Sequence, residues 1–171
     1  MREALSYAIA HRAAEAVLEA ARSEGARVCV AVVNRSGVIK VLLSDDGVGR
    51  IGIETARRKA YTAAVTGVPT SKFAALAASP ALALAPVHLV DADLLPVPGG
   101  VPITVDDGEV IGVVGVGGAD GETDERLASR ALEGLKDLLD RAAVPPMTSV
   151  PPATPAAPVM SGTLKENDRD R

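Results

Sequence analysis

The fold is decided by residues 98–124, which read PGGVPITVDDGEVIGVVGVGGADGETD. Asp107 and Gly108 separate two runs of β-branched residues, and glycine tolerates the positive φ that a tight turn between strands requires. The stretch therefore predicts a β-hairpin. Its second strand carries glycines at positions 112, 115, 117 and 118, where a missing side chain lets another backbone or a ligand approach closely. We therefore expect this hairpin to form one wall of a site.

A second hairpin is predicted earlier in the chain. Two apolar runs, 28–33 and 38–43, flank the sequence Asn34-Arg35-Ser36-Gly37, which has the composition of a type I turn. The first run is apolar on both faces, which is typical of a central strand covered by helices on both sides.

Helical spacing of apolar residues predicts helices at 3–23, 51–66, 70–78 and 123–142, the last with Thr123 as its N-cap. Residues 81–97 are apolar without a clear period and contain Pro86 and Pro96, so they are expected to form an extended excursion that leads into the hairpin. These elements predict an α+β domain with three α/β/α layers, in which helices flank a mainly antiparallel sheet.

Composition narrows the class of protein. The chain of 171 residues has 47% hydrophobic and 23% charged residues, which fits one globular domain at 1–143. Residues 144–171 are rich in proline and are expected to form a disordered tail. The formal net charge of −4 argues against a nucleic-acid partner, and no apolar run is long enough to cross a membrane. Without an export signal, the cytoplasm is the expected location.

Metal and disulfide chemistry have little support in the sequence. The single cysteine, Cys29, excludes an internal disulfide and a cysteine-rich metal site. The two histidines, His11 and His88, have no partner at the spacing of zinc ligands. No metal is therefore expected as a dedicated cofactor.

Several motifs in the right order resemble the GlcG/HbpS-like family over roughly residues 3–142. They are Ala31-Val32-Val33-Asn34 with Gly37, Asp46-Gly47, Ala56-x-x-Lys59-Ala60-x-Thr62-Ala63, Gly67-x-Pro69-Thr70, Pro98-Gly99-Gly100-x-Pro102-Ile103 and Gly108-Glu109-Val110-Ile111-Gly112-x-x-Gly115-Val116-x-Gly118, closed by Asp124-Glu125. The resemblance implies a profilin-like fold with a five-stranded antiparallel sheet, a homo-oligomer, and haem as a possible cofactor. Asn34, Ser44 and Gly117 depart from the usual pattern, so the ligand of this chain could differ.

Lys59 is the first candidate site residue because it lies on a predicted helix among small residues. A partly desolvated lysine could hold a carboxylate or act as a base. The alternative is a surface lysine whose stem packs on the sheet, since lysine is mostly exposed.

Backbone donors near Thr70 and the Gly99-Gly100 pair form a second candidate. Thr70 most simply caps the short helix, which would leave the N–H groups of Ser71 and Lys72 at a helix N-terminus suited to anions. Gly99 and Gly100 offer similar donors, although a strained turn would also explain them. Together these groups could cradle a carboxylate, an enolate or a carbonyl oxygen.

Histidines and acidic residues complete the candidates. His88, in the excursion, could be an axial haem ligand or a general base, or simply a hydrogen-bonded histidine. His11 is expected to be exposed and could reach a ligand shared between chains of a symmetric oligomer. Asp46 could transfer a proton, and Tyr61 could donate a hydrogen bond to a ligand. The acidic clusters 45–46 and 122–125 are otherwise explained as solvated carboxylates.

Three functions follow from these residues and from the resemblance. The leading hypothesis is a small oligomeric domain that binds an organic ligand, and the resemblance implies haem or another tetrapyrrole as the first candidate. The second is a cofactor-independent enzyme for a small carbonyl or enol compound, in which Lys59, His88 or Asp46 moves the proton and the amides of Gly99 and Gly100 stabilise the oxyanion. The third is an interaction protein that docks through its proline-rich tail.

Overall fold

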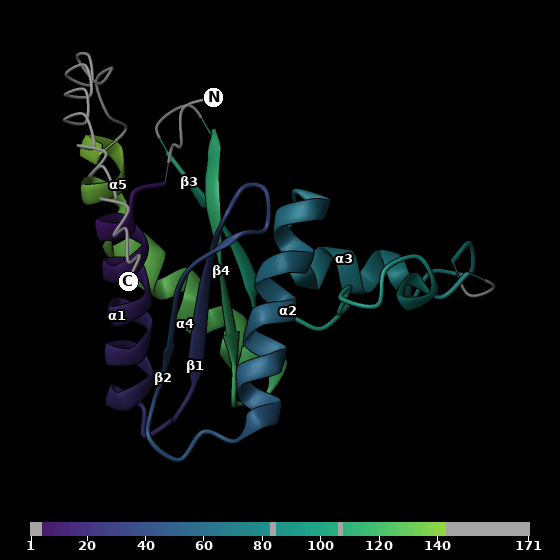
Figure 1. The fold of residues 1–171 in the computed structure, drawn as a ribbon, viewed down its shortest axis with the longest axis horizontal. Coiled ribbons are helices and arrows are strands. Elements are labelled where there is room, and N and C mark those ends of the chain that lie inside the picture. Colours follow the sequence, from purple (N-terminus) through teal and green to yellow (C-terminus); the bar gives the residue numbers. More distant parts are fainter. Residues whose placement is uncertain (1–4, 83–84, 106–107, 143–171) are drawn as a thin grey trace, which may run out of the picture.

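The computed structural model describes residues 5–82, 85–105 and 108–142 of the chain (Figure 1). The predicted tail, 144–171, lies outside the described residues. The helices are α1 Tyr7–Ser23, α2 Arg50–Thr66, α3 Thr70–Ala77, the 3-10 helix η1 Val87–Leu89, α4 Gly121–Gly134 and α5 Lys136–Ala142. The strands are β1 Cys29–Asn34, β2 Ile39–Ser44, β3 Gly100–Thr104 and β4 Val110–Gly117. None of the described helices is both long and apolar enough to cross a membrane.

Both predicted hairpins are confirmed. The strands form an antiparallel sheet in the order β2-β1-β4-β3. In the first turn the Asn34 side-chain oxygen accepts hydrogen bonds from the N–H groups of Ser36 and Val38 at 3.0 Å each. Gly37 completes this turn with a φ of +78°, a conformation that glycine adopts without strain.

The described residues contain four strands, so the prediction of five is wrong. The excursion before β3 folds instead into turns and the 3-10 helix η1, and it projects beyond α2 (Figure 1). Its prolines explain the difference, because proline has no N–H group to donate to a neighbouring strand.

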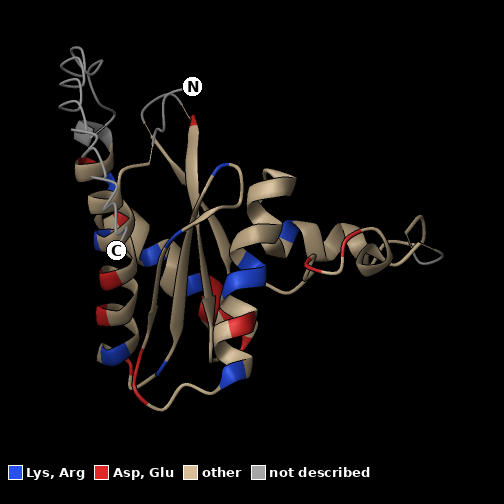
Figure 2. Ribbon diagram, in the orientation of Figure 1, with Lys and Arg blue, Asp and Glu red and all other residues tan. Residues whose placement is uncertain are grey.

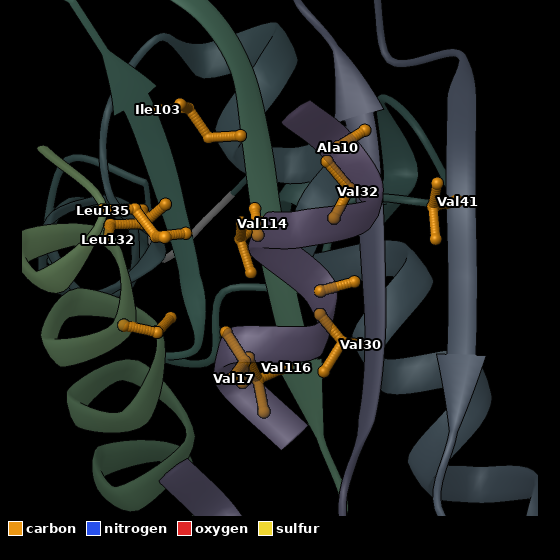
Figure 3. Packing of buried hydrophobic residues seen from close by; sticks show 14 of the residues in the cluster. Ala10, Val17, Val30, Val32, Val41, Ile103, Val114, Val116, Leu132 and Leu135 are labelled. Carbon is orange, nitrogen blue, oxygen red and sulfur yellow. The ribbon is translucent and has the colours of Figure 1, made fainter. Parts of the chain in front are cut away.

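The three predicted layers are present, with helices on both faces of the sheet. One face packs against α1 and α4 in the larger apolar core, which includes Val17, Val30, Val114 and Leu132 (Figure 3). The opposite face packs against α2 in a smaller core of small and β-branched residues. Charged residues recur along α1 (Figure 2), and among them Arg12 and Glu19 are exposed and hydrogen-bonded to each other.

The helix ends differ in part from the predictions. The first helix begins at Tyr7, because the Ser6 hydroxyl accepts a hydrogen bond from the Ile9 N–H and caps it. The last helix is divided into α4 and α5 at Leu135. Its N-cap is Asp120 and not Thr123, since the Asp120 carboxylate accepts from the Thr123 N–H at 3.0 Å.

The glycines of β4 allow α2 to lie directly on the sheet, as the sequence predicts. A Cβ atom added at Gly115 would collide with the backbone of Ala56 and Ala60 in α2. One added at Gly117 would collide with Gly52 and the following turn of the same helix. The small-residue face of α2 and the glycines of β4 therefore bring two backbones into direct contact.

We expect Gly115→Ala to lower the free energy of unfolding by roughly 1–3 kcal/mol, because the added methyl group must push α2 away from the sheet. Urea unfolding of the purified variant measures the change. Gly134→Ala is the matched control, because nothing lies within 4 Å of a Cβ atom added there. Equal losses in the two variants would contradict the close approach of α2 and β4.

Candidate functional site

A buried ion pair joins the two helical layers through the end of the sheet. The Lys59 Nζ atom of α2 donates a hydrogen bond to the Asp124 Oδ2 atom of α4 at 2.6 Å. The exposed fractions of these residues are 3% and 0%. Lys59 is therefore not a surface lysine, and Asp124 is not a solvated carboxylate, so both of these alternatives are wrong.

Asp124 is held from two sides. Its second carboxylate oxygen accepts a hydrogen bond from the Ala119 N–H at 3.2 Å. Burial raises the pKa of Asp124, while the hydrogen bond and the positive charge of Lys59 act in the opposite direction. The charge of Lys59 therefore favours the ionised form of Asp124 that burial disfavours.

Lys59 is enclosed by the hairpin. A Cβ atom added at Gly99 would lie 2.8 Å from the Lys59 Cδ atom and 2.9 Å from its Nζ atom. An ammonium group has three N–H donors. Among the described residues, Asp124 is the one hydrogen-bond acceptor of Lys59, which leaves donor capacity beside the cavity that Lys59 helps to line.

That cavity has a volume of about 630 Å³ and lies between the start of α2, the end of the excursion and the loop before α4. Its apolar wall comes from Val48, Ile51, Leu95 and Val97. The rest of its lining has two cationic side chains and one hydroxyl among small residues, namely Arg27, Lys59 and Thr55 with Gly47, Gly49, Gly52, Gly118, Ala119 and Gly121. The cavity can therefore take an organic molecule that is apolar along one side and anionic along another.

The rim of the cavity carries donors for an anion. The exposed Arg27 donates to the backbone oxygen of Asp46 at 3.1 Å, which holds its guanidinium against the loop that leads into α2. The N-cap of α2 is Gly49, which provides no side-chain cap. The first turn of α2 therefore has N–H groups without a side-chain cap, and this turn and Arg27 both line the cavity, where the helix dipole favours negative charge.

The cradle predicted near Thr70 exists, but the protein fills it with its own carboxylate. Glu125 accepts hydrogen bonds from the Ser71 N–H at 3.2 Å, from the Ser71 hydroxyl and from the Gly99 N–H at 3.1 Å. The Gly100 N–H donates to the Thr70 hydroxyl at 2.8 Å. These amides are therefore engaged inside the protein and are not free to stabilise an oxyanion.

Thr70 itself is not the N-cap of α3, which is Pro69. It is fully buried, and its methyl group lies against Gly100. Its hydroxyl joins the start of α3 to β3 behind Lys59. The structure therefore brings Lys59, Thr70, Gly99 and Gly100 together, as the family motifs suggest.

Asp46 and Tyr61 lie at the edges of this group. Asp46 is exposed, and its backbone oxygen accepts the hydrogen bond from Arg27, which lines the cavity. Tyr61 is outside the cavity lining and donates its hydroxyl to Asp91 at 2.7 Å, a bond that raises the pKa of Tyr61. Together with the ion pair of Arg57 and Asp93, it ties the excursion to α2.

The two histidines lie apart from the cavity. His88 is exposed on η1 and is not one of the residues that line it. His11 is on α1, on the opposite face of the sheet, where its ring lies 5.6 Å from that of Tyr7 and its Nδ1 atom 3.5 Å from Glu15. Within this chain the structure does not bring either histidine to Lys59.

Arg27 and the charge-balancing role of Asp124 were missed from the sequence. Arg27 precedes β1 without any distinctive local pattern. For Asp124, a signal was available, because a lysine on a small-residue helix face needs a buried counter-charge. The acidic residues at the start of the last helix were the nearest candidates in the motif.

We expect Lys59→Met to lower the free energy of unfolding by roughly 3–5 kcal/mol, because it leaves the Asp124 carboxylate buried without its cationic partner. Chemical unfolding of the variant measures this loss. Lys72→Met, at an exposed lysine of α3, is the control and should change stability little. The double variant Lys59→Met with Asp124→Leu should recover much of the loss, since it removes both charges.

The defect of Lys59→Met should also depend on pH. Burial raises the folded-state pKa of Asp124 above the ordinary value of an aspartate, so the folded variant binds a proton that the unfolded chain has already released. Its stability then falls as pH rises through that window and levels off above the folded-state pKa. A deficit that grew toward acidic pH would contradict the unpaired carboxylate.

Known proteins share this architecture. The model of the haem-degrading protein HbpS-like family matches residues 5–133. A solved double mutant of HbpS from Streptomyces reticuli is 37% identical, with a TM-score of 0.68, over 77% of this chain and 86% of that chain. The protein ORFY from Klebsiella pneumoniae is 28% identical, with a TM-score of 0.68, over 75% of this chain and 88% of that chain.

PduOC, solved as a complex with heme, is 25% identical, with a TM-score of 0.68, over 75% of this chain and 93% of that chain. No curated protein sequence matches the chain significantly. The family match spans both hairpins, the Lys59 helix and Asp124, and it confirms the resemblance found in the sequence. The chain belongs to the HbpS-like family of haem-degrading proteins.

Proposed function

We propose that the protein binds an organic ligand with a carboxylate group in the cavity beside Lys59, and that haem or another tetrapyrrole is the first candidate. The observation that carries the proposal is the buried Lys59 ammonium in the cavity wall, with one acceptor among the described residues. A buried charge with unused donors is costly unless an acceptor reaches it.

The family relationship and the shape of the cavity favour a tetrapyrrole. One relative is solved as a complex with heme. The propionate groups of haem are carboxylates, which suit Arg27 and the first turn of α2. Its flat apolar ring suits the wall formed by Val48, Ile51, Leu95 and Val97.

The cavity does not fit the iron of haem as well as it fits the carboxylates. Among the described residues, those that line it include no His, Cys, Met or Tyr. The amine of Lys59 is engaged with Asp124. The proposal is therefore recognition of the porphyrin edge and face by the cavity, without a histidine ligand to the iron.

We expect haemin and metal-free protoporphyrin IX to bind with similar dissociation constants, because the cavity contacts the parts that the two ligands share. Absorbance of the Soret band and fluorescence of the free porphyrin measure the two titrations. Arg27→Ala should weaken both roughly tenfold, the value of one charge-assisted hydrogen bond. Arg12→Ala, on the opposite face of the sheet, is the control.

Two outcomes would contradict this proposal. Non-saturating adsorption of both ligands would exclude a tetrapyrrole site. Tight binding of haemin alone, weakened by His88→Ala or His11→Ala and unchanged by Arg27→Ala, would place the ligand on a histidine outside the cavity.

The expected homo-oligomer stays a prediction. The excursion exposes apolar side chains, including Leu89 at 74% and Val90 at 83%, and a second copy of the chain could cover them. Light scattering of the purified protein tests it. Docking through the proline-rich tail is also a prediction, and it concerns residues outside those described.

A further inference from the structure

The Lys59 site combines three features that favour the reaction of a lysine amine with a carbonyl compound. A primary amine lies in the wall of a cavity, a carboxylate lies 2.6 Å from it, and both are withdrawn from water. Binding of a tetrapyrrole edge uses the positive charge of the lysine but not its chemistry as an amine. In that kind of binding, the buried Asp124 carboxylate would only neutralise the charge of Lys59.

We infer that Lys59 forms an imine with the carbonyl carbon of a small oxo acid, and that Asp124 carries the protons of the reaction. This inference rests on the proposed cavity, and it names a second class of ligand for it. The carboxylate of the oxo acid would take the place proposed for a propionate, next to Arg27 and the first turn of α2. Its carbonyl group would point along the cavity wall toward Lys59.

The step balances without an external reagent. The Lys59 ammonium transfers one proton to Asp124 Oδ2, and the lone pair of the amine forms a bond to the carbonyl carbon. The carbonyl oxygen takes the proton from Asp124 and becomes a hydroxyl group. Asp124 then takes a second proton from the nitrogen and gives it to the hydroxyl group, so the carbon–oxygen bond breaks and water leaves. The Lys59 ammonium and the carbonyl group become a protonated imine and water, Asp124 returns to its carboxylate form, and no oxidation state changes.

The surroundings of the pair favour this exchange of protons. The short distance from Nζ to Oδ2 allows direct transfer, and burial raises the pKa of Asp124, which makes its carboxylate a stronger proton acceptor than an exposed one. Gly99 closes the site from the side of the hairpin, because a Cβ atom there would contact the amine. The Ala119 N–H holds the second oxygen of Asp124, so the carboxylate keeps its position as the proton moves.

The test is reductive trapping of the full-length protein with sodium cyanoborohydride and one of two methyl ketones, pyruvate or acetone. Both have the same carbonyl group, but pyruvate alone has a carboxylate. Peptide mapping by mass spectrometry then reports which lysine carries the added group. We expect pyruvate to modify Lys59 roughly tenfold faster than the exposed Lys72, because a bound ligand reacts at a raised effective concentration. Acetone should show no such preference.

Variants separate the parts of the inference. Arg27→Ala should remove the preference for pyruvate at Lys59, and Asp124→Asn should slow trapping there while labelling of Lys72 is unchanged. The distribution of label over the lysines of the unmodified protein tests the inference even if a variant at the buried pair fails to fold. Equal labelling of Lys59 and Lys72 by pyruvate would overturn it. Saturable porphyrin binding without selective trapping would refute the imine alone, whereas the absence of both would also refute the proposed cavity function.

Discussion

The hydrogen-bonded ion pair of Lys59 and Asp124 is the interaction on which the rest of this structure depends. It connects α2 on one face of the sheet with α4 on the other, across the end of β4, at a point where neither charge reaches water. Two charges are costly to bury, and they are retained where each satisfies the other. The positions of the two helices are therefore linked, and so are the two walls of the cavity that they enclose.

The close contact of α2 with the sheet makes this pair possible. Small residues on α2 and glycines in β4 remove the side chains that would otherwise separate the layers. Lys59 can then reach past the sheet to Asp124, with Gly99 packed against its stem. The same glycine donates to Glu125, so the residue after Asp124 fixes the hairpin while Asp124 fixes the lysine. Two neighbouring carboxylates at the start of α4 therefore organise the hairpin, α2 and α3 around one site.

The chemistry of the cavity follows from what surrounds this pair. Its apolar wall and its cationic rim suit a ligand with an apolar body and an anionic end. The family to which the chain belongs is named for haem, and no histidine is among the described residues that line the cavity, which supports the proposed recognition of the porphyrin edge instead of the iron. The Lys59 amine beside the buried Asp124 carboxylate also suits imine formation, an inference that does not depend on the family relationship.

Both hairpins, the helices at 51–66 and 70–78 and the layered arrangement could be predicted from the sequence, because turn composition and apolar periodicity act over a few residues. Lys59, Thr70, Gly99 and Gly100 could also be selected as site residues from the sequence, because each of them lies in one of the family motifs. The burial of Asp124, the use of the Gly99 amide by Glu125 and the separation of His88 and His11 from the cavity were decided by the tertiary structure alone. Each depends on contacts between residues far apart in the chain, and a residue's neighbours along the sequence do not determine whether a distant partner will satisfy its charge or its hydrogen bonds.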